Sequence, residues 1–327
     1  MSAGVATTEP EFVRATERYR RELVVHCYRM LGSVEDAEDV VQETYMRAWR
    51  AYSGFEGRAS VRTWLYHIAT NATLTALEHH SRRVLPSGLG APSDDPVTVA
   101  VPAGPGVRWI EPIPDALIAP ESEDPAAVVA ARAGLRLALI ASLQRLPPRQ
   151  RAVLILRDAL SFRAHEVAAM LGTSTAAVKS ALQRARATLD DGGGGELVEP
   201  GEPRAQALLD QYVAAFERSD MTLLERALRD DAALEMAGST TWFAGKRTCV
   251  PYIRRFLRSP GDWRMVPTVA NGQPAVLAYQ RDQGGVYAAY AVAVLTVSAA
   301  GIGRITLFSD AGALERFGTR IMDGPAP

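Results

Sequence analysis

The amino-acid sequence predicts a multidomain protein in which two all-α domains precede an α+β domain. The chain has 327 residues, more than the roughly 150 residues of one typical domain. Residues 84–126 are rich in Pro and Gly, and residues 190–195 end in four glycines, so both stretches are expected to separate domains. Helix-forming sequence precedes the second break, and several strand patterns follow it. The predicted domains are 9–83, 127–190 and 203–322.

Composition excludes a disordered protein, and the distribution of charge indicates one basic segment. Hydrophobic residues make up 47% and charged residues 22% of the chain, which is the balance of a globular protein and not of a disordered one. The net charge is −1, so the whole chain lacks a nucleic-acid-binding signature. Residues 143–189, however, hold eight basic and two acidic residues, whereas the linker 84–126 holds one basic and seven acidic residues. The basic segment is therefore suited to a polyanion.

The cysteines and the apolar stretches indicate in which cellular compartment the protein is expected. Cys27 and Cys249 form no CxxC pair, so we expect reduced thiols, no metal site and no cofactor. Residues 1–8 lack the basic start and apolar core of a signal peptide. Residues 283–303 are uncharged, but their small and β-forming residues between glycines favour a buried strand over a membrane span. We expect a cytoplasmic protein without membrane contact.

Residues 161–186 have the pattern of a helix-turn-helix. An apolar face ends at Gly172, where glycine permits the positive φ of a tight turn, and a second helix is expected over 174–189. An ordinary helical hairpin with a solvated face is the alternative, which the local basic charge disfavours. The outward side chains suit base edges and phosphates in a major groove. They are Thr173, Thr175, Lys179, Ser180, Gln183, Arg184 and Arg186.

A capped helix near the N-terminus presents a second polar surface. Ser33 is a predicted N-cap, and acidic residues follow it where the helix dipole favours them. An apolar stripe that includes Tyr45 and Trp49 is expected to continue along this helix. The alternative to a binding surface is that the polar side of the helix is simply solvated. The polar surface consists of Asp36, Asp39, Gln42 and Glu43.

Residues 55–77 combine a glycine-bearing loop with an aromatic, polar helix. Such side chains can stack on and hydrogen-bond unstacked bases. Packing in the core of a helical domain is the alternative, which we favour for Trp64. The candidates for base contact are Arg58, Arg62, Trp64, Tyr66, His67 and Asn71.

Three blocks in this order resemble the extracytoplasmic-function (ECF) group of sigma-70 family RNA polymerase sigma factors. They read DAEDVVQETYMRAW, FEGRASVRTWLYHIATN and LPPRQRAVLILRDALSFRAHEVAAMLGTSTAAVKSALQRAR. The resemblance implies that core RNA polymerase and promoter DNA are the partners. It also implies that the first block docks on the clamp helices of the polymerase β′ subunit. Residues 55–75 would open and read the minus-ten element, and helix 174–189 would read the minus-thirty-five element beside the β flap.

The linker and one departure need separate expectations. Relatives often carry more polar or basic residues where this chain has Leu74, Thr75 and Leu77, so promoter preference is not carried over. The linker of relatives threads toward the active-site cleft of the polymerase. Residues 109–115, WIEPIPD, resemble a short motif of ECF sigma factors that have a C-terminal extension. Their prolines and apolar residues fit equally well a strap that docks onto the protein's own domains.

Residues 203–322 resemble SnoaL-like domains of the cone-shaped nuclear-transport-factor-2-like fold. Helices are expected over 205–228 and 246–258, with strands between them and a meander through residue 308. Some members of that fold are enzymes, but residues 203–327 contain no histidine, so no catalytic residues are assigned. The remaining candidates for a catalytic base are Asp231, Glu235 and Asp310. The alternative for each is that it is a solvent-exposed acid at the end of a strand, without a catalytic role. Candidates for lining a pocket are Trp242, Tyr252, Phe256 and Trp263, although core packing explains aromatics as well.

The sequence therefore predicts a non-enzymatic transcription initiation factor whose C-terminal domain modulates its activity. One alternative is that this domain binds a small molecule, or acts on it as an isomerase-type enzyme fused to a DNA-binding unit. A repressor that uses only the helix-turn-helix is a third reading, but it leaves the first two blocks unexplained.

Overall fold

The structure is a computed structural model, and it describes residues 9–78, 81–118, 129, 132–189 and 197–319. Internal contacts divide the chain into two compact units. Unit 1 comprises Met1–Arg83 and Ala138–Gly193, and unit 2 comprises Val84–Leu137 and Gly194–Pro327. The glycine-rich break predicted at 190–195 lies outside the described residues.

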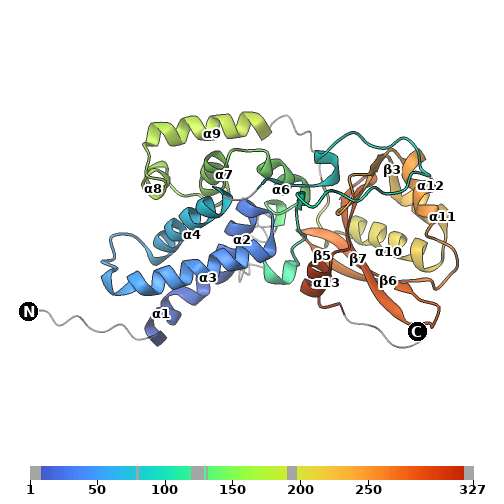
Figure 1. Cartoon of the computed structure of the whole chain (residues 1–327), viewed down its shortest axis with the longest axis horizontal. Helices are drawn as coiled ribbons and strands as arrows, with labels where there is room; N and C mark the ends of the chain where they lie inside the picture. The colour runs from blue at the N-terminus through green and yellow to red at the C-terminus, as the bar shows by residue number, and fades with distance from the viewer. Residues whose placement is uncertain (1–8, 79–80, 119–128, 130–131, 190–196, 320–327) are drawn as a thin grey trace, which may run out of the picture. The chain divides into compact units, whose positions relative to one another are not determined.

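Unit 1 is helical (Figure 1). Its N-terminal elements are α1 (Glu9–Thr16), η1 (Glu17–Tyr19), α2 (Arg20–Leu31), α3 (Val34–Ala51), η2 (Tyr52–Gly54) and α4 (Val61–Glu78). Its later elements are α6 (Leu137–Gln144), α7 (Pro148–Leu154), the π-helical turn η5 (Ile155–Ala159), α8 (Ala164–Met170) and α9 (Thr175–Leu189). The first residue of α6, Leu137, is assigned to unit 2.

Local sequence signals explain where these helices begin and end. Ser33 caps α3 as predicted, because its Oγ accepts a hydrogen bond from the backbone N–H of Asp36 at 3.1 Å. Gly172 adopts φ +59° between α8 and α9, so the predicted helix-turn-helix is present. Val178 of α9 is buried, and the predicted outward side chains of this helix are exposed.

Unit 2 is built around a mixed six-stranded sheet with the order β4-β3-β8-β7-β6-β5. The strands are β3 (Leu228–Met236), β4 (Trp242–Ala244), β5 (Trp263–Ala270), β6 (Gln273–Arg281), β7 (Tyr287–Ser298) and β8 (Gly301–Phe308). Only the pair β3–β8 is parallel among these strands. The helices of this unit are α10 (Pro203–Glu217), α11 (Met221–Ala227), α12 (Lys246–Arg254) and α13 (Ala311–Arg316).

The core of unit 2 lies where α10 and α12 pack on the sheet (Figure 1). Tyr212 and Phe216 of α10 meet Trp263 of β5 in this cluster, and all three are buried. Most of the uncharged stretch 283–303 lies in β7, and its last three residues begin β8, so it forms strand and not a helix, as its composition predicted. Within the described residues, no helix combines the length and the apolar character that crossing a bilayer requires.

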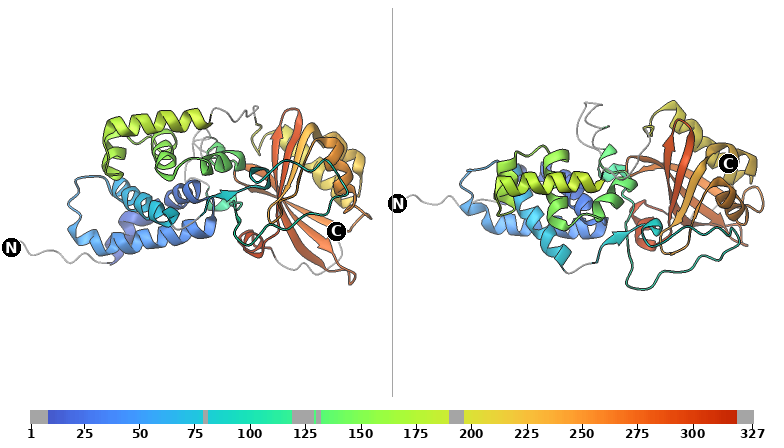
Figure 2. Two further views of the ribbon diagram at one scale, coloured as in Figure 1. Left: turned by 45° about the horizontal axis from the view of Figure 1, so that its top comes forward. Right: turned by 90° about the horizontal axis from the view of Figure 1, so that it is seen from above.

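The segment that follows residue 83 belongs to unit 2 and includes η3 (Pro86–Gly88), β2 (Arg108–Trp109) and η4 (Asp115–Leu117). Strand β1 (Arg83–Val84) consists of the last residue of unit 1 in this part of the chain and the first of unit 2. The segment runs as extended chain past the strands of unit 2 (Figure 2). Three isolated bridges tie it to the unit, and these are Ser93↔Phe243, Pro102↔Ser239 and Pro114↔Ala270. The described part of this linker therefore forms a strap on the C-terminal fold, which is the second of the two alternatives that its sequence allowed.

Candidate functional surfaces

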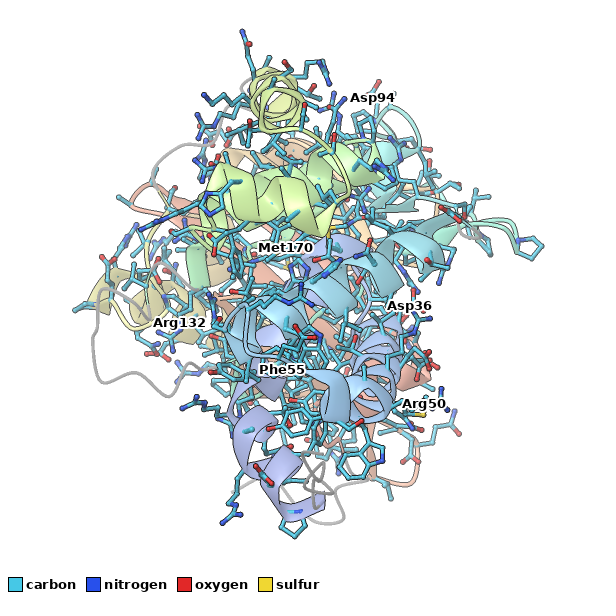
Figure 3. The ribbon with its side chains drawn as sticks, turned by 90° about the vertical axis from the view of Figure 1, so that its left-hand side faces the viewer. Asp36, Arg50, Phe55, Asp94, Arg132 and Met170 are labelled. Atoms are coloured by element: carbon cyan, nitrogen blue, oxygen red, sulfur yellow. The ribbon has the colours of Figure 1, made fainter. Side chains whose placement is uncertain are left out.

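The exposed side of α3 carries a hollow of about 500 Å³. Asp39 and Gln42 are exposed and line it, so two of the four predicted polymerase-binding residues are open. Asp36 and Glu43 instead form ion pairs, because Arg83 reaches Asp36 at 2.9 Å and Arg47 reaches Glu43 at 2.6 Å. In Figure 3, Asp36 and Arg50 mark the two ends of α3.

Two apolar side chains of this hollow were not predicted as binding residues. Met46 is 42% exposed and Trp49 is 43% exposed, and both line the hollow. Trp49, expected in the apolar stripe of this helix, is thus exposed, although its ring packs edge-on against Phe12 at 5.3 Å. The spacing 39, 42, 46, 49 puts these residues on one helical face, which is the signal that could have found them. Exposed large apolar residues beside polar ones are typical of protein-binding surfaces.

The predicted base-contacting side chains of α4 divide into open and covered groups. Arg58 and His67 are exposed, and Trp64 is half-buried between Phe55 and Tyr52. Tyr66 is fully buried, which contradicts its expected availability to unstacked bases in this conformation. Its hydroxyl lies 3.2 Å from the Glu22 carboxylate, and burial raises the pKa of that hydroxyl.

The helix-turn-helix block covers this part of α4. Phe162, which precedes α8, contacts the Tyr66 ring edge-on at 5.2 Å and lies beneath the Arg62 guanidinium at 5.1 Å. The Asn71 amide donates a hydrogen bond to the Met170 carbonyl of α8 at 3.1 Å, and Figure 3 shows Met170 beside the α4 ribbon. Arg62, Tyr66 and Asn71 are thus engaged within unit 1 in this conformation.

A buried arginine fixes the same two helical blocks together. Arg151 of α7 is 3% exposed and donates hydrogen bonds to the Met30 carbonyl of α2 and to the side chain of Gln144. Burial, with Arg82 nearby, lowers the pKa of Arg151 to about 10. The basic count of residues 143–189 therefore overstates the charge offered to DNA. Arg186, at the end of the predicted DNA-reading face, is likewise paired with Asp158 at 2.7 Å.

The turn between β5 and β6, Asn271–Gly272, binds the linker and also the chain around Leu135, which follows the linker. The Asn271 side chain accepts a hydrogen bond from the N–H of Ile113 at 3.0 Å and donates one to the carbonyl of Leu135 at 2.8 Å. The Gly272 N–H donates to the Asp115 carboxylate at 2.8 Å. Gly272 adopts φ +64°, and a Cβ there would lie 2.7 Å from the backbone of Arg132, so the fit admits no side chain. The sequence marked Asn-Gly only as a hairpin turn.

Buried linker side chains complete this docking. Ile110 and Ile113 of the WIEPIPD motif are fully buried, and Glu111 pairs with Arg316 of α13 at 3.0 Å. Near the start of the linker, the N–H of Ser87 donates to the Glu235 carboxylate at 3.2 Å. The strap is thus held by apolar, ionic and backbone contacts together.

The three candidate carboxylates of unit 2 all have structural partners. Asp231 pairs with Arg229 at 2.5 Å, and Asp310 caps α13 by accepting the Ala313 N–H at 2.8 Å. Glu235 is fully buried and ion-paired with Arg304, so its reading as an exposed strand-end acid is wrong. Its neighbours on β8 and the linker cover it, and no alternation within β3 could have shown that.

Three of the four predicted pocket aromatics line one cavity of about 50 Å³ in unit 2, and these are Tyr252, Phe256 and Trp263. Trp242 lies outside this cavity. Its indole N–H donates to the Gly90 carbonyl at 2.9 Å, so it contacts the linker instead.

Comparisons with known proteins cover both helical blocks and, for some relatives, most of the chain. The Sigma-70 region 2 family model matches residues 15–83, and the Sigma-70, region 4 model matches residues 136–189. The ECF RNA polymerase sigma factor SigG of Mycobacterium tuberculosis is 46% identical over 313 residues, which are 94% of this chain and 84% of that protein. The probable ECF RNA polymerase sigma factor SigI of the same organism is 27% identical over 267 residues, 81% of this chain and 83% of that one.

One solved structure supports the fold. The crystal structure of the Mycobacterium tuberculosis extracytoplasmic function sigma factor SigJ matches with a TM-score of 0.62 at 22% identity. The match covers 93% of this chain and 98% of that chain, so it includes both the helical blocks and the sheet-rich C-terminal part.

Proposed function

The chain belongs to the ECF RNA polymerase sigma factors, and from this we propose that its C-terminal unit restrains initiation by holding the linker between the two sigma regions. Sigma factors bind core RNA polymerase and direct it to promoter DNA, so the protein is a transcription initiation factor and not an enzyme. We expect it to act in the cytoplasm, where its polymerase is.

Each surface takes one role in this proposal. The hollow on α3, with Asp39, Gln42, Met46 and Trp49, docks on the β′ clamp helices. Asp36 and Glu43 join that interface by exchanging their present ion pairs for polymerase contacts. The face of α4 reads the minus-ten element, and α9 reads the minus-thirty-five element beside the β flap. The proposed domains are 9–83, the linker 84–126, 127–190 and the regulatory domain 203–322.

The observation that carries the proposal is the grip of the Asn271–Gly272 turn on the linker. In a sigma factor that threads this segment toward the active-site cleft, the residues held by the turn must leave it when polymerase binds. A buried hydrogen bond is worth about 1 kcal/mol net, so breaking several of them subtracts from the free energy of polymerase binding. The C-terminal unit then lowers holoenzyme formation by competing for the linker.

Coverage of α4 supports a second restraint of the same kind. Arg62, Tyr66 and Asn71 cannot contact bases while Phe162 and Met170 occupy them, so promoter opening requires the two sigma regions to separate. A ligand of the C-terminal domain is a further part of this proposal, since it could shift the balance between held and released linker.

Reconstituted transcription tests the proposal with one matched pair of glycine variants. Gly272→Ala places a methyl group against Arg132, whereas Gly318→Ala has a similar positive φ but open space around the added carbon. We expect Gly272→Ala to initiate several-fold more than wild type on core polymerase, and Gly318→Ala to match wild type. A chain ending at Asp191 should also exceed wild type.

Two results would contradict the proposal. If Gly272→Ala and the shortened chain both initiate no more than wild type, the C-terminal unit does not restrain. If no form of the chain directs core polymerase to any promoter of a library, the assignment of the surfaces fails as well.

A further inference from the structure

One stretch of unit 2, residues 246–258, is strongly basic. The described residues 197–319 of this unit include thirteen basic and thirteen acidic residues, so this part of the chain is neutral as a whole. Five of the basic residues fall within 246–258, which contains no acidic residue. The surfaces proposed above give no role to this concentration of charge. The five basic residues are Lys246, Arg247, Arg254, Arg255 and Arg258.

Helix α12 separates its charged side from an apolar one. Val250 and Ile253 are buried in the core of unit 2 and fix which side of the helix faces the sheet. Arg247 and Arg254 are seven residues apart, close to two helical turns, so they share the outer side of α12. Pro251, between them on that side, is exposed as well. The helix thus presents a basic face to solvent.

Two of the five basic side chains have partners within unit 2. The Lys246 ammonium lies 3.2 Å from the carboxylate of Asp230. The Arg255 guanidinium donates hydrogen bonds to the linker carbonyls of Pro96 and Thr98, both at 3.3 Å. These two residues therefore have local roles and are left out of the argument that follows.

The other three guanidinium groups are open to solvent. Arg247 and Arg258 are exposed, and neither forms an ion pair with another residue that the structure describes. Arg254 reaches Glu225 of α11 at 3.5 Å, but its side chain remains 63% exposed, and Figure 1 shows α11 next to α12. Exposed ion pairs of this kind are weak because water screens them. An anion can therefore bind Arg254 in place of Glu225.

The basic face fits the phosphate backbone of duplex DNA. A guanidinium group can donate two parallel hydrogen bonds to the oxygens of one phosphate. The rise from Arg247 to Arg254 along α12 is about 10 Å, and one DNA strand carries about three phosphates over that length. Three guanidinium groups thus have phosphates within reach of a single strand.

The absence of apolar anchors from this face disfavours a protein or a membrane as its partner. Residues 246–258, all of which the structure describes, have no exposed large apolar side chain. The hollow on α3 differs in this respect, because it exposes Met46 and Trp49. Aromatic and aliphatic anchors are typical of protein interfaces, and a helix that lies on a membrane buries an apolar side in the lipid.

We propose that α12 and the residues that follow it, as far as Arg258, bind the phosphate backbone of duplex DNA without reading its sequence. This face adds a contact to promoter DNA beside those of the two sigma regions. Phosphates are the same at every base step, so the contact raises affinity and not sequence preference. Its binding to DNA is measured without polymerase, so its failure and that of the proposed linker release are distinguishable.

Fluorescence anisotropy of the full-length chain with short duplexes of random sequence tests the proposal over a series of salt concentrations. Arg247→Gln combined with Arg258→Gln removes two charges at exposed positions and keeps polar side chains there. We expect this double variant to bind about tenfold more weakly at low salt. The plot of log affinity against log salt concentration should become about two units shallower, since each phosphate contact contributes a slope of about 0.9.

Arg204→Gln is the matched control for a single loss of charge. Arg204 is exposed and lies at the start of α10, outside 246–258. This control should leave affinity and slope unchanged, whereas Arg247→Gln alone should make the slope about one unit shallower. Circular dichroism checks that each variant folds, as expected for changes at exposed positions.

Two results would overturn the proposal. One is a folded Arg247→Gln, Arg258→Gln chain with the affinity and the salt dependence of wild type. If wild type then binds phosphatidylglycerol vesicles and the double variant does not, the basic face belongs to a membrane contact instead. The other is an Arg204→Gln chain that loses as much affinity as Arg247→Gln, since net charge and not this face would then govern binding.

Discussion

His26 is a buried histidine at the junction of α2 and α4 in the helical unit. It is fully buried, with one ring nitrogen 3.0 Å from the Thr70 hydroxyl and the other without a hydrogen-bond partner. Burial, with the positive charges of Arg29 and Arg62, lowers its pKa to about 3. The folded chain therefore holds this side chain neutral, whereas the unfolded chain protonates it near its ordinary pKa of about 6.5.

The stability of unit 1 should consequently fall on acidification. Stability from neutral His26 is fully present above pH 6.5 and is lost as the pH falls from there toward 3, by up to roughly 1.4 kcal/mol per pH unit. Urea unfolding between pH 7 and pH 4 measures this slope. His26→Gln should flatten it, and His165→Gln, at an exposed position, should leave it unchanged. Equal slopes in wild type and His26→Gln would contradict this account.

At the scale of elements, the sequence predicted more of the fold than of the surfaces. Alternation and turn residues predicted the strands β5 to β8, and Gly172 with its flanking apolar residues predicted α8 and α9, because these signals are local. Periodicity also indicates which side of an element is apolar. It does not indicate which distant element covers the polar side, so the burial of Tyr66 and Glu235 and the pairing of Asp36 with Arg83 came only from the structure.

The contact between α4 and Phe162, which lies two residues before α8, leads to a prediction about DNA. Phe162→Ala removes the ring that covers Tyr66 and Arg62, and truncation of a buried Phe costs about 3–5 kcal/mol of packing. The closed arrangement of the two sigma regions should weaken, and the affinity of the free chain for a pool of short single-stranded DNA should rise about tenfold. Fluorescence anisotropy measures this affinity.

The matching control truncates a phenylalanine elsewhere. Phe317→Ala lies at the end of α13 in unit 2 and should leave DNA affinity unchanged. A folded Phe162→Ala chain that binds the pool no better than wild type would show that the α4–α8 contact does not limit access to DNA.

At the scale of the whole molecule, the proposal assigns different roles to the two units. Unit 1 carries both sigma regions, and unit 2 combines the sheet with the described linker residues 84–118. Sequence composition marked residues 84–126 as a linker because it is rich in Pro and Gly and acidic. Composition does not reveal that Ile110 and Ile113 bury themselves in the C-terminal fold, since that depends on a partner far away in the chain.

A reversible disulfide between the linker and the sheet tests the central claim most directly. Pro114 and Ala270 are antiparallel bridge partners, and facing residues of an antiparallel pair lie within the Cα separation of about 4.4–6.8 Å that a disulfide accepts. Pro114→Cys with Ala270→Cys would lock the linker when oxidised, and Pro114→Cys alone controls for oxidation and for loss of the proline. The native Cys27 and Cys249 are buried.

Transcription by core polymerase is then measured for the double variant before and after reduction. The account predicts little initiation by the oxidised chain and recovery to at least the wild-type level on reduction, with the single variant indifferent to the reductant. If the fully cross-linked chain initiates as well as the reduced chain, the linker need not leave the C-terminal unit, and the proposed restraint is wrong.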